Sequence, residues 1–238
     1  MNKIKTLVVA VFAISIVSIS GMAISLYADQ RNYVWTYEYK TMKRGEVELE
    51  YYHTLLSPER SKMKGITTTE QQMELEIGMT DKFDFSIYQK YSQKPSQSFK
   101  YDGFKLRGRY KLNPNKLFDP LIYAEYKNDS SLSGSKWEFK LILAKDYGKL
   151  NISINPIIEI ENNETEFKYA AGMHYQLKPL FGIGLEATGS EYANYIGPTI
   201  THGNENVWVS FGSGFAIGDV KNNKEKSKLR LLIGIKLK

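Results

Sequence analysis

The sequence predicts an all-β chain that folds as a transmembrane antiparallel up-and-down β-barrel of about twelve strands, preceded by a cleaved signal peptide. Apolar and polar residues alternate with period two from Gly45 to the last residue, which is typical of half-buried strands. Most alternating segments are long enough for a tilted strand to cross a bilayer, which takes about 9–11 residues. Aromatic residues make up 13% of the chain, and membrane barrels carry aromatic girdles at both lipid interfaces.

The composition excludes several other classes of protein. Mean hydropathy is −0.39, and no run beyond the leader is apolar enough to span a membrane as a helix. A barrel is not visible in such an average, because only alternate residues face lipid. The chain has no cysteine, so disulfides and thiolate metal sites are excluded. The net charge of +6 is spread without a basic tail or cluster, so no nucleic-acid partner is expected.

The first 28 residues predict a secretory signal peptide. Two lysines lie within the first five residues, and an uncharged apolar run follows from Thr6 to about Ile24. Cleavage after Ala28, or after Ala23, fits the preference for a small residue before the cut. The alternative is an uncleaved membrane anchor, because the apolar run is long for the core of a signal. With no cysteine near the cut, a lipoprotein anchor is excluded.

Three parts follow from this pattern: the signal peptide at 1–28, an N-terminal segment at 29–44 and a single barrel domain at 45–238. The N-terminal segment has aromatic residues at alternate positions, namely Tyr33, Trp35, Tyr37 and Tyr39. It is expected to form either a short extra strand or an interfacial collar. The strands of the barrel are predicted near residues 45–54, 67–79, 82–91, 99–111, 121–127, 136–145, 149–160, 165–177, 181–188, 194–201, 206–217 and 228–237.

The connections between these strands tend to alternate in length, as expected for short periplasmic turns and longer external loops. The tight ones are 79–82, 146–149 and 178–180, and the longer polar ones are 55–65, 92–98, 128–135 and 218–227. Two connections depart from the rule. The link at 113–120 is long where a short one is expected, and the link at 161–164 is short where a long one is expected.

Each predicted strand has one apolar and one charged face. Leu75, for example, lies opposite Glu74 and Glu76. A soluble sandwich would pack the apolar faces together, whereas a membrane barrel turns them toward lipid and keeps the charges in its lumen. Long uniform strands, aromatic residues near strand ends and a last strand that runs to the terminus favour the barrel. The terminal Lys238 departs from the aromatic residue that ends many outer-membrane barrels.

The inward charges define the candidate site. Acidic residues concentrate on the first two strands and basic residues on the fourth, so two walls of opposite charge would set a transverse field across a wet constriction. The alternative is that these groups pair with one another and fill the lumen. The predicted pore-lining residues are Glu46, Glu48, Glu50, Glu74, Glu76, Asp84, Lys105, Arg107, Arg109, Lys111, Glu138, Lys140 and Arg230.

The opening of the predicted barrel resembles a known group of proteins. Residues 33–39, YVWTYEY, and 45–52, GEVELEYY, resemble the first strands of small outer-membrane barrels grouped as transporters of the phenol-degradation (MetA-pathway) type. The general layout is also similar to twelve-stranded outer-membrane channels for nucleosides and acidic sugars. The resemblance is specific only over these two segments. It implies passive passage of small molecules and supplies no matched substrate residues.

The motifs of enzymes and metal sites are weak in this chain. Outer-membrane phospholipase barrels place a histidine two residues before the catalytic serine, and none of the three histidines here has that spacing. The acid pairs Glu46/Glu48 and Glu74/Glu76 could act as the two catalytic carboxylates of a glycosidase or bind a hard cation. Their many acidic neighbours favour a solvated or salt-bridged wall instead. Gly-x-Gly at 182–184 and 212–214 lies inside strands, where small inward residues make room for bulky neighbours. We therefore predict no catalytic residue, metal or cofactor.

These observations predict a bacterial outer-membrane channel for passive diffusion of small polar or aromatic solutes through a charged lumen. The alternative is a sealed structural or adhesive barrel with a salt-bridged lumen, and an outer-membrane lipid hydrolase is the least favoured class. The expected partners are outer-membrane lipid, the outer-membrane assembly machinery and a small-molecule solute. The sequence leaves open the solute, the ion selectivity and the oligomeric state.

Overall fold

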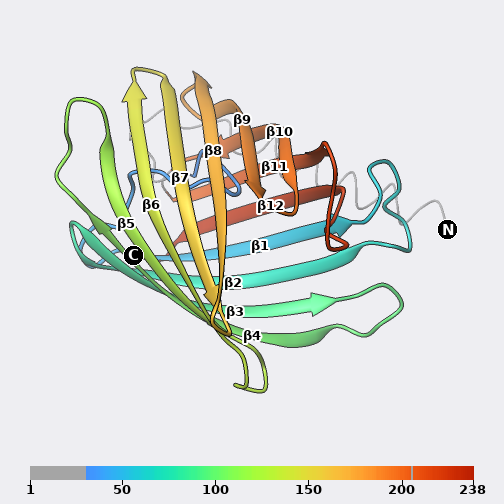
Figure 1. Cartoon of the computed structure of the whole chain (residues 1–238). Coiled ribbons are helices and arrows are strands. Elements are labelled where there is room, and N and C mark those ends of the chain that lie inside the picture. Colours follow the sequence, from blue (N-terminus) through green and yellow to red (C-terminus); the bar gives the residue numbers. More distant parts are fainter. Residues whose placement is uncertain (1–30, 205) are drawn as a thin grey trace, which may run out of the picture.

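The computed structural model describes residues 31–204 and 206–238; the predicted signal peptide lies outside the described residues. Within these ranges the chain forms a closed antiparallel barrel of twelve strands, in which each strand pairs with its neighbours in sequence and the first pairs with the last (Figure 1). The strands are β1 (Val47–Ser57), β2 (Thr68–Thr80), β3 (Phe83–Gln93), β4 (Lys100–Lys111), β5 (Asp119–Asn128), β6 (Ser135–Tyr147), β7 (Leu150–Glu161), β8 (Glu164–Lys178), β9 (Phe181–Ser190), β10 (Asn194–Gly203), β11 (Val207–Ile217) and β12 (Ser227–Lys236).

The twelve predicted strands are confirmed, with their ends shifted by three residues or fewer. In-register pairing explains why alternation along one strand becomes a continuous face of the barrel. Glu50 of β1 pairs with Glu74 of β2, for example, so the acidic side chains of both strands lie on the same side. In the described residues, no helix is long and apolar enough to cross a membrane.

The two faces of the wall differ as a membrane barrel requires. The outer face carries large, exposed apolar side chains: the exposed fractions of Leu75, Phe139 and Ile154 are 37%, 43% and 48%. The inner face carries buried charges such as Glu74 and Arg107. In a soluble sandwich the apolar faces would cover each other, whereas here they surround the outside of a closed wall. The prediction of a barrel over a sandwich is therefore confirmed.

Local turn chemistry explains the two connections of unexpected length. Asn162 and Asn163 both have positive φ, 50° and 67°, which is the backbone of a two-residue type I′ hairpin and is favoured by asparagine. The link between β7 and β8 is short for this reason. The longer link between β4 and β5 is ordered by Asn115, whose Oδ1 accepts hydrogen bonds from the backbone N–H groups of Leu117 and Phe118.

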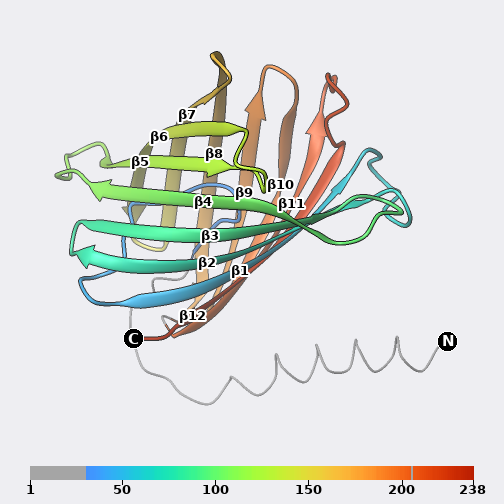
Figure 2. The ribbon, with the colours of Figure 1, turned by 90° about the horizontal axis from the view of Figure 1, so that it is seen from below.

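Residues 31–44, which we call the plug segment, lie inside the barrel (Figures 1 and 2). The sequence suggested a short strand or an interfacial collar for 29–44, but residues 31–44 contain no strand, and Tyr33 and Val34 are fully buried. The physical reason is that β1 and β12 close the barrel. A closed wall has no free edge to which another strand could pair, so the backbone of the plug segment bonds to inward side chains instead.

Candidate functional site in the lumen

The structure brings the predicted pore-lining residues to the inner face of the wall, with Glu46 at the rim just before β1. Eight of the thirteen are buried, namely six acids of β1, β2, β3 and β6 and the two arginines of β4, and the other five are half-buried. The inner-face residues are Glu46, Glu48, Glu50, Glu74, Glu76, Asp84, Lys105, Arg107, Arg109, Lys111, Glu138, Lys140 and Arg230. That these side chains line a conducting path remains a prediction.

Deeply buried charges of β2, β3 and β4 lie side by side on the inner face. Nη2 of Arg107 lies 2.8 Å from Oε1 of Glu74 and 2.6 Å from Oε2 of Glu76. Arg109 pairs with Glu76 and, through Nε at 2.9 Å, with Oδ1 of Asp84. Only β3 separates β2 from β4 in the barrel, and an arginine is long enough to reach across it. The interpretation of two walls facing each other across open water is therefore corrected: the opposite charges pair directly.

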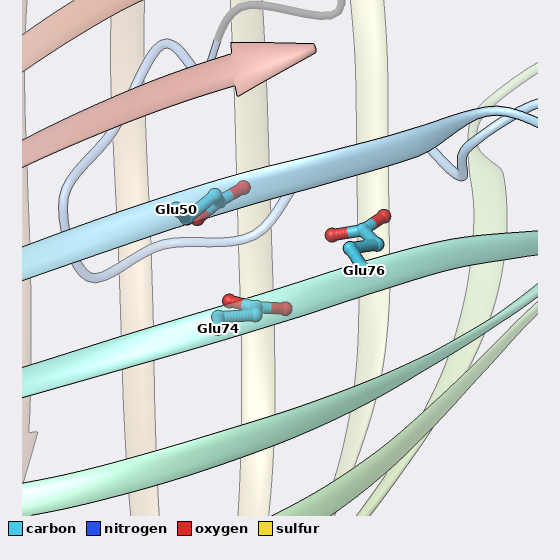
Figure 3. A group of neighbouring side chains, drawn as sticks. All are labelled: Glu50, Glu74 and Glu76. Atoms are coloured by element: carbon cyan, nitrogen blue, oxygen red, sulfur yellow. The ribbon is translucent and has the colours of Figure 1, made fainter. Parts of the chain in front are cut away.

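Three carboxylates of β1 and β2 converge in this region (Figure 3). Oxygen atoms of Glu50, Glu74 and Glu76 lie within 4.8 Å of one another, a spacing that could hold a metal ion. Positive charge is already present beside them, because Arg107 pairs with Glu74 and Glu76, and Arg31 of the plug segment lies 3.5 Å from Glu50. The group is thus explained as part of an ion-pair network.

A second network lies on β5, β6 and β7. Nζ of Lys127 lies 3.2 Å from Glu125, 2.7 Å from Glu138 and 3.3 Å from Glu159. Lys140 adds a contact of 2.8 Å to Glu138. Lys127 was absent from the residues predicted to face inward. Its place two positions after the inward Glu125 is the signal that could have identified it.

One buried carboxylate binds three consecutive residues of the plug segment. Glu186 of β9 accepts hydrogen bonds from three consecutive backbone N–H groups: Val34 at 2.7 Å, Trp35 at 2.9 Å and Thr36 at 2.8 Å. Successive N–H groups that converge in this way form an anion-binding concavity. Glu186 is buried, so these donors compensate for the water that its charge has lost. Hydrogen bonds to a charged group are among the stronger ones in proteins.

Neutral side chains of the wall bind the rest of the plug segment. Asn155 accepts a hydrogen bond from the Tyr37 N–H at 2.6 Å and donates one to the Tyr37 carbonyl at 3.1 Å. Ser210 donates to the Arg31 carbonyl at 2.6 Å, on the other side of the barrel. The backbone of the plug segment thus satisfies its polar groups on several strands at once, which holds it across the lumen.

Two wall glycines make room for the plug segment. A Cβ on Gly172 would collide with the ring of Tyr33, and a Cβ on Gly212 would collide with Val34. The prediction that Gly-x-Gly at 212–214 leaves space for bulky neighbours is confirmed here, because Gly214 likewise lies against the Lys228 side chain. Beside Arg31 the structure leaves a cavity of about 20 Å³, which holds roughly one water.

Comparisons with known proteins place this architecture among outer-membrane channels. No family model matches the chain, and no curated protein does. The KdgM porin in complex with disordered oligogalacturonate has 13% identity over 79% of this chain and 97% of its own, with a TM-score of 0.59. An outer-membrane channel of Pseudomonas putida F1 has 12% identity over 86% and 100%, with a TM-score of 0.59. The NanC porin has 12% identity over 80% and 99%, with a TM-score of 0.58.

At this level of identity the likeness shows the fold, which is that of small outer-membrane porins and channels with a closed antiparallel barrel. These neighbours are themselves described as porins or channels. The more specific resemblance to transporters of the phenol-degradation type is not shown by these matches.

Proposed function

We propose that this chain is a bacterial outer-membrane channel for passive diffusion of small polar or aromatic solutes, and that the plug segment closes its lumen at rest. The observation that carries the proposal is a charged lumen filled by a segment that is not part of the wall. The plug segment is bound through side-chain hydrogen bonds, such as those of Glu186 and Asn155. Such bonds can exchange for water, whereas removal of a wall strand would break a whole ladder.

The outer surface supports placement in a membrane. Apolar side chains such as Ile154 and Phe139 are exposed on the outside of the closed wall, and an apolar band of this kind is stable against lipid. Lipid and the assembly machinery of the outer membrane are therefore proposed as partners. Cleavage after Ala28, as the sequence predicts, would leave the plug segment close to a free N-terminus that could leave the lumen.

Two lines of support bear on the class of solute. The KdgM porin is described in complex with oligogalacturonate, a polar solute of that protein. The resemblance of residues 33–39 and 45–52 to transporters of the phenol-degradation type points to aromatic solutes. Both classes agree with a lumen that combines charged side chains and tyrosines, such as Tyr52 and Tyr88.

A sealed structural or adhesive barrel is the second candidate, and one observation favours it. Arg107 is only 1% exposed and is paired with Glu74 and Glu76, so the wall itself contributes to the filling of the lumen. The two candidates differ in the mobility of the plug segment. A channel needs the segment to move, whereas a sealed barrel does not.

An engineered disulfide tests this difference directly, because the chain has no cysteine of its own. Val34 and Gly212 lie against each other, so close that a Cβ on Gly212 would touch the valine. The double substitution Val34→Cys and Gly212→Cys therefore places two thiols within reach of a disulfide, which needs a Cβ separation of about 3.5–4.5 Å. Conductance of the refolded barrel in a planar bilayer is then measured before and after reduction.

The channel proposal expects no conductance steps from the oxidised variant and discrete steps after reduction. Each single cysteine variant serves as a control and should conduct under both conditions. Absence of steps from the reduced variant, the single variants and the unchanged chain, all with intact heat-modifiable migration, would favour the sealed barrel. Equal steps before and after verified oxidation would show that solutes pass without movement of the plug segment.

A further inference from the structure

A second cavity, with a mixed apolar and charged lining, lies at the end of the barrel that carries the long loops. Its volume is about 250 Å³. It is lined by residues of β7, β8, β9, β10 and β12, by the loops before β10 and β12 and by Trp35 of the plug segment. Its main basic group is Lys228, which is buried. The cavity therefore joins the wall, an outer loop and the plug segment in one place.

Lys228 has neutral partners, whereas inward lysines such as Lys127 and Lys140 pair with carboxylates. Its Nζ donates to Oγ1 of Thr188 at 2.7 Å and lies 4.6 Å and 4.2 Å from the ring centres of Trp35 and Tyr195. Among the described residues no carboxylate oxygen lies within 4.0 Å of this ammonium group. The aromatic faces offset part of its charge, but they do not neutralise it.

The next inward position on the same strand repeats the pattern. Nε of Arg230 donates to Oγ1 of Thr54 at 2.9 Å, and its Nη1 donates to the Val34 carbonyl at 3.1 Å. Its guanidinium lies 5.6 Å from the ring centre of Trp35. By contrast, Lys127 contacts three carboxylates. Two neighbouring cations on β12 thus lie around Trp35 without an acidic partner within ion-pair distance in the described part of the chain.

We propose that this cavity binds a small organic anion through its carboxylate, with Lys228 as the main contact. A buried charge is costly unless it is paired, and a bound carboxylate would supply the missing partner. The cavity is large enough for a compact solute, and its apolar lining by Ile157 and Ala193 suits the carbon skeleton. Glu166 and Glu225 also line it, so a dianion or a bulky polyanion is disfavoured.

The site adds a class of solute to the proposed function. Its effect on the plug segment rests on that proposed function. Trp35 and the Val34 carbonyl belong to the plug segment, and both contact the cations of β12. A carboxylate at Lys228 would compete with these contacts and weaken the attachment of the segment. Binding itself needs no conducting pore, so it can be tested apart from conductance.

The test is isothermal titration of the refolded full barrel in detergent micelles with two anions, benzoate and glucuronate, and with their neutral counterparts, benzamide and glucose. The shared carboxylate predicts that at least one anion binds and that its counterpart binds about tenfold more weakly or not at all. The two acids distinguish an aromatic solute from a sugar solute. Affinity for the anion should also fall as salt concentration rises.

Lys228→Gln should weaken anion binding about tenfold or more. The matched control is Lys236→Gln on the same strand, which removes a lysine paired with Glu46 near the opposite rim and should leave the affinity unchanged. Lys228→Arg keeps the charge and should retain binding. If Lys228→Gln does not show heat-modifiable migration, Arg230→Gln replaces it as the test and should weaken binding in the same direction.

Failure of both acids to bind the folded barrel would overturn the site, as would equal affinity for an acid and its neutral counterpart. Full affinity of a folded Lys228→Gln variant would do the same. A barrel that conducts but binds neither acid would overturn this site and leave the channel proposal standing. A barrel that binds an acid but never conducts would overturn the channel and leave the site in place.

Discussion

The carboxylate of Glu186 accepts a hydrogen bond of 2.7 Å from the backbone N–H of Val34, a residue that precedes it by 152 positions in the chain. The next two N–H groups of the plug segment bind the same carboxylate. A single side chain on β9 therefore positions the turn that closes the lumen. In a channel this contact must break for the lumen to open, whereas in a sealed barrel it stays intact.

Glu186→Gln should loosen the plug segment. The amide has only one acceptor oxygen, so its NH₂ group must face N–H groups that the carboxylate now binds. We expect a loss of about 2 kcal/mol, which corresponds to roughly 30-fold more time in the open state. Single-channel recording measures this change directly. Glu159→Gln is the matched control, because Glu159 pairs with Lys127 and Lys168 of the wall and its substitution should leave the open time nearly unchanged.

Gly172→Val should displace the plug segment from the side of the wall. A Cβ at this position collides with the ring of Tyr33, whose hydroxyl bonds to Asn151 at 2.9 Å. The side chain cannot be accommodated without movement of the ring, so we expect faster tryptic cleavage within residues 31–44 of the folded barrel. The double variant Gly172→Val with Tyr33→Ala removes the collision. If the single variant were cleaved as slowly as the unchanged chain, the close packing of Tyr33 would be wrong.

Arg107→Leu should destabilise the barrel by about 3–5 kcal/mol, because it leaves the buried Glu74 and Glu76 without their shared partner. Urea unfolding in detergent or lipid vesicles measures this loss. Adding Glu74→Gln to Arg107→Leu should recover part of the stability, since it removes one of the orphaned charges. Additive effects of the two substitutions would contradict a direct interaction between these side chains.

Ile154→Arg tests the direction in which β7 faces. Ile154 is 48% exposed on the outer face, and an arginine near the middle of a bilayer costs about 2–4 kcal/mol. The variant should unfold at lower urea concentration from lipid vesicles. Leu237→Arg, beyond the end of β12, is the control, because a charge near an interface costs about 0–1 kcal/mol. Equal stability of the two variants would argue against a lipid-facing Ile154.

The loop between β5 and β6 offers a prediction on pH. Asp129 accepts hydrogen bonds from the backbone N–H and hydroxyl groups of Ser131 and Ser133, which lower its pKa to about 2. Because the pKa is depressed in the folded state, the bonds are retained at neutral pH and lost only as the pH falls toward 2. Carboxyl chemical shifts from NMR titration should show this midpoint, and Asp129→Asn should remove it.

The positions and the faces of the strands were predictable from the sequence because they depend on a local property. Side chains alternate across a strand with period two, so Leu75 and Glu74 must lie on opposite faces wherever the strand is placed. Long uniform strands, aromatic residues near strand ends and a last strand at the terminus then favoured a barrel over a sandwich. The inward direction of Arg107 and Glu76 was predictable for the same reason.

The pairing of those charges was decided by tertiary structure. Alternation tells which face Arg107 occupies, but not that it reaches past β3 to Glu74 and Glu76. Ion pairing depends on distances between side chains of different strands, and these follow from the curvature of the closed wall. The acidic strand β2 and the basic strand β4, which the sequence suggested would face each other across the lumen, are therefore joined by ion pairs.

The position of residues 31–44 inside the lumen likewise could not be predicted from the sequence. Their alternating aromatic residues satisfy the local rule for a strand, but every edge of the wall was already paired once β1 met β12. The segment then took its hydrogen bonds from Glu186, Asn155 and Ser210, which lie on three different strands. Local sequence thus determined the wall and its two faces, whereas the closure of the barrel determined what fills it, because only closure brings those distant side chains around one segment.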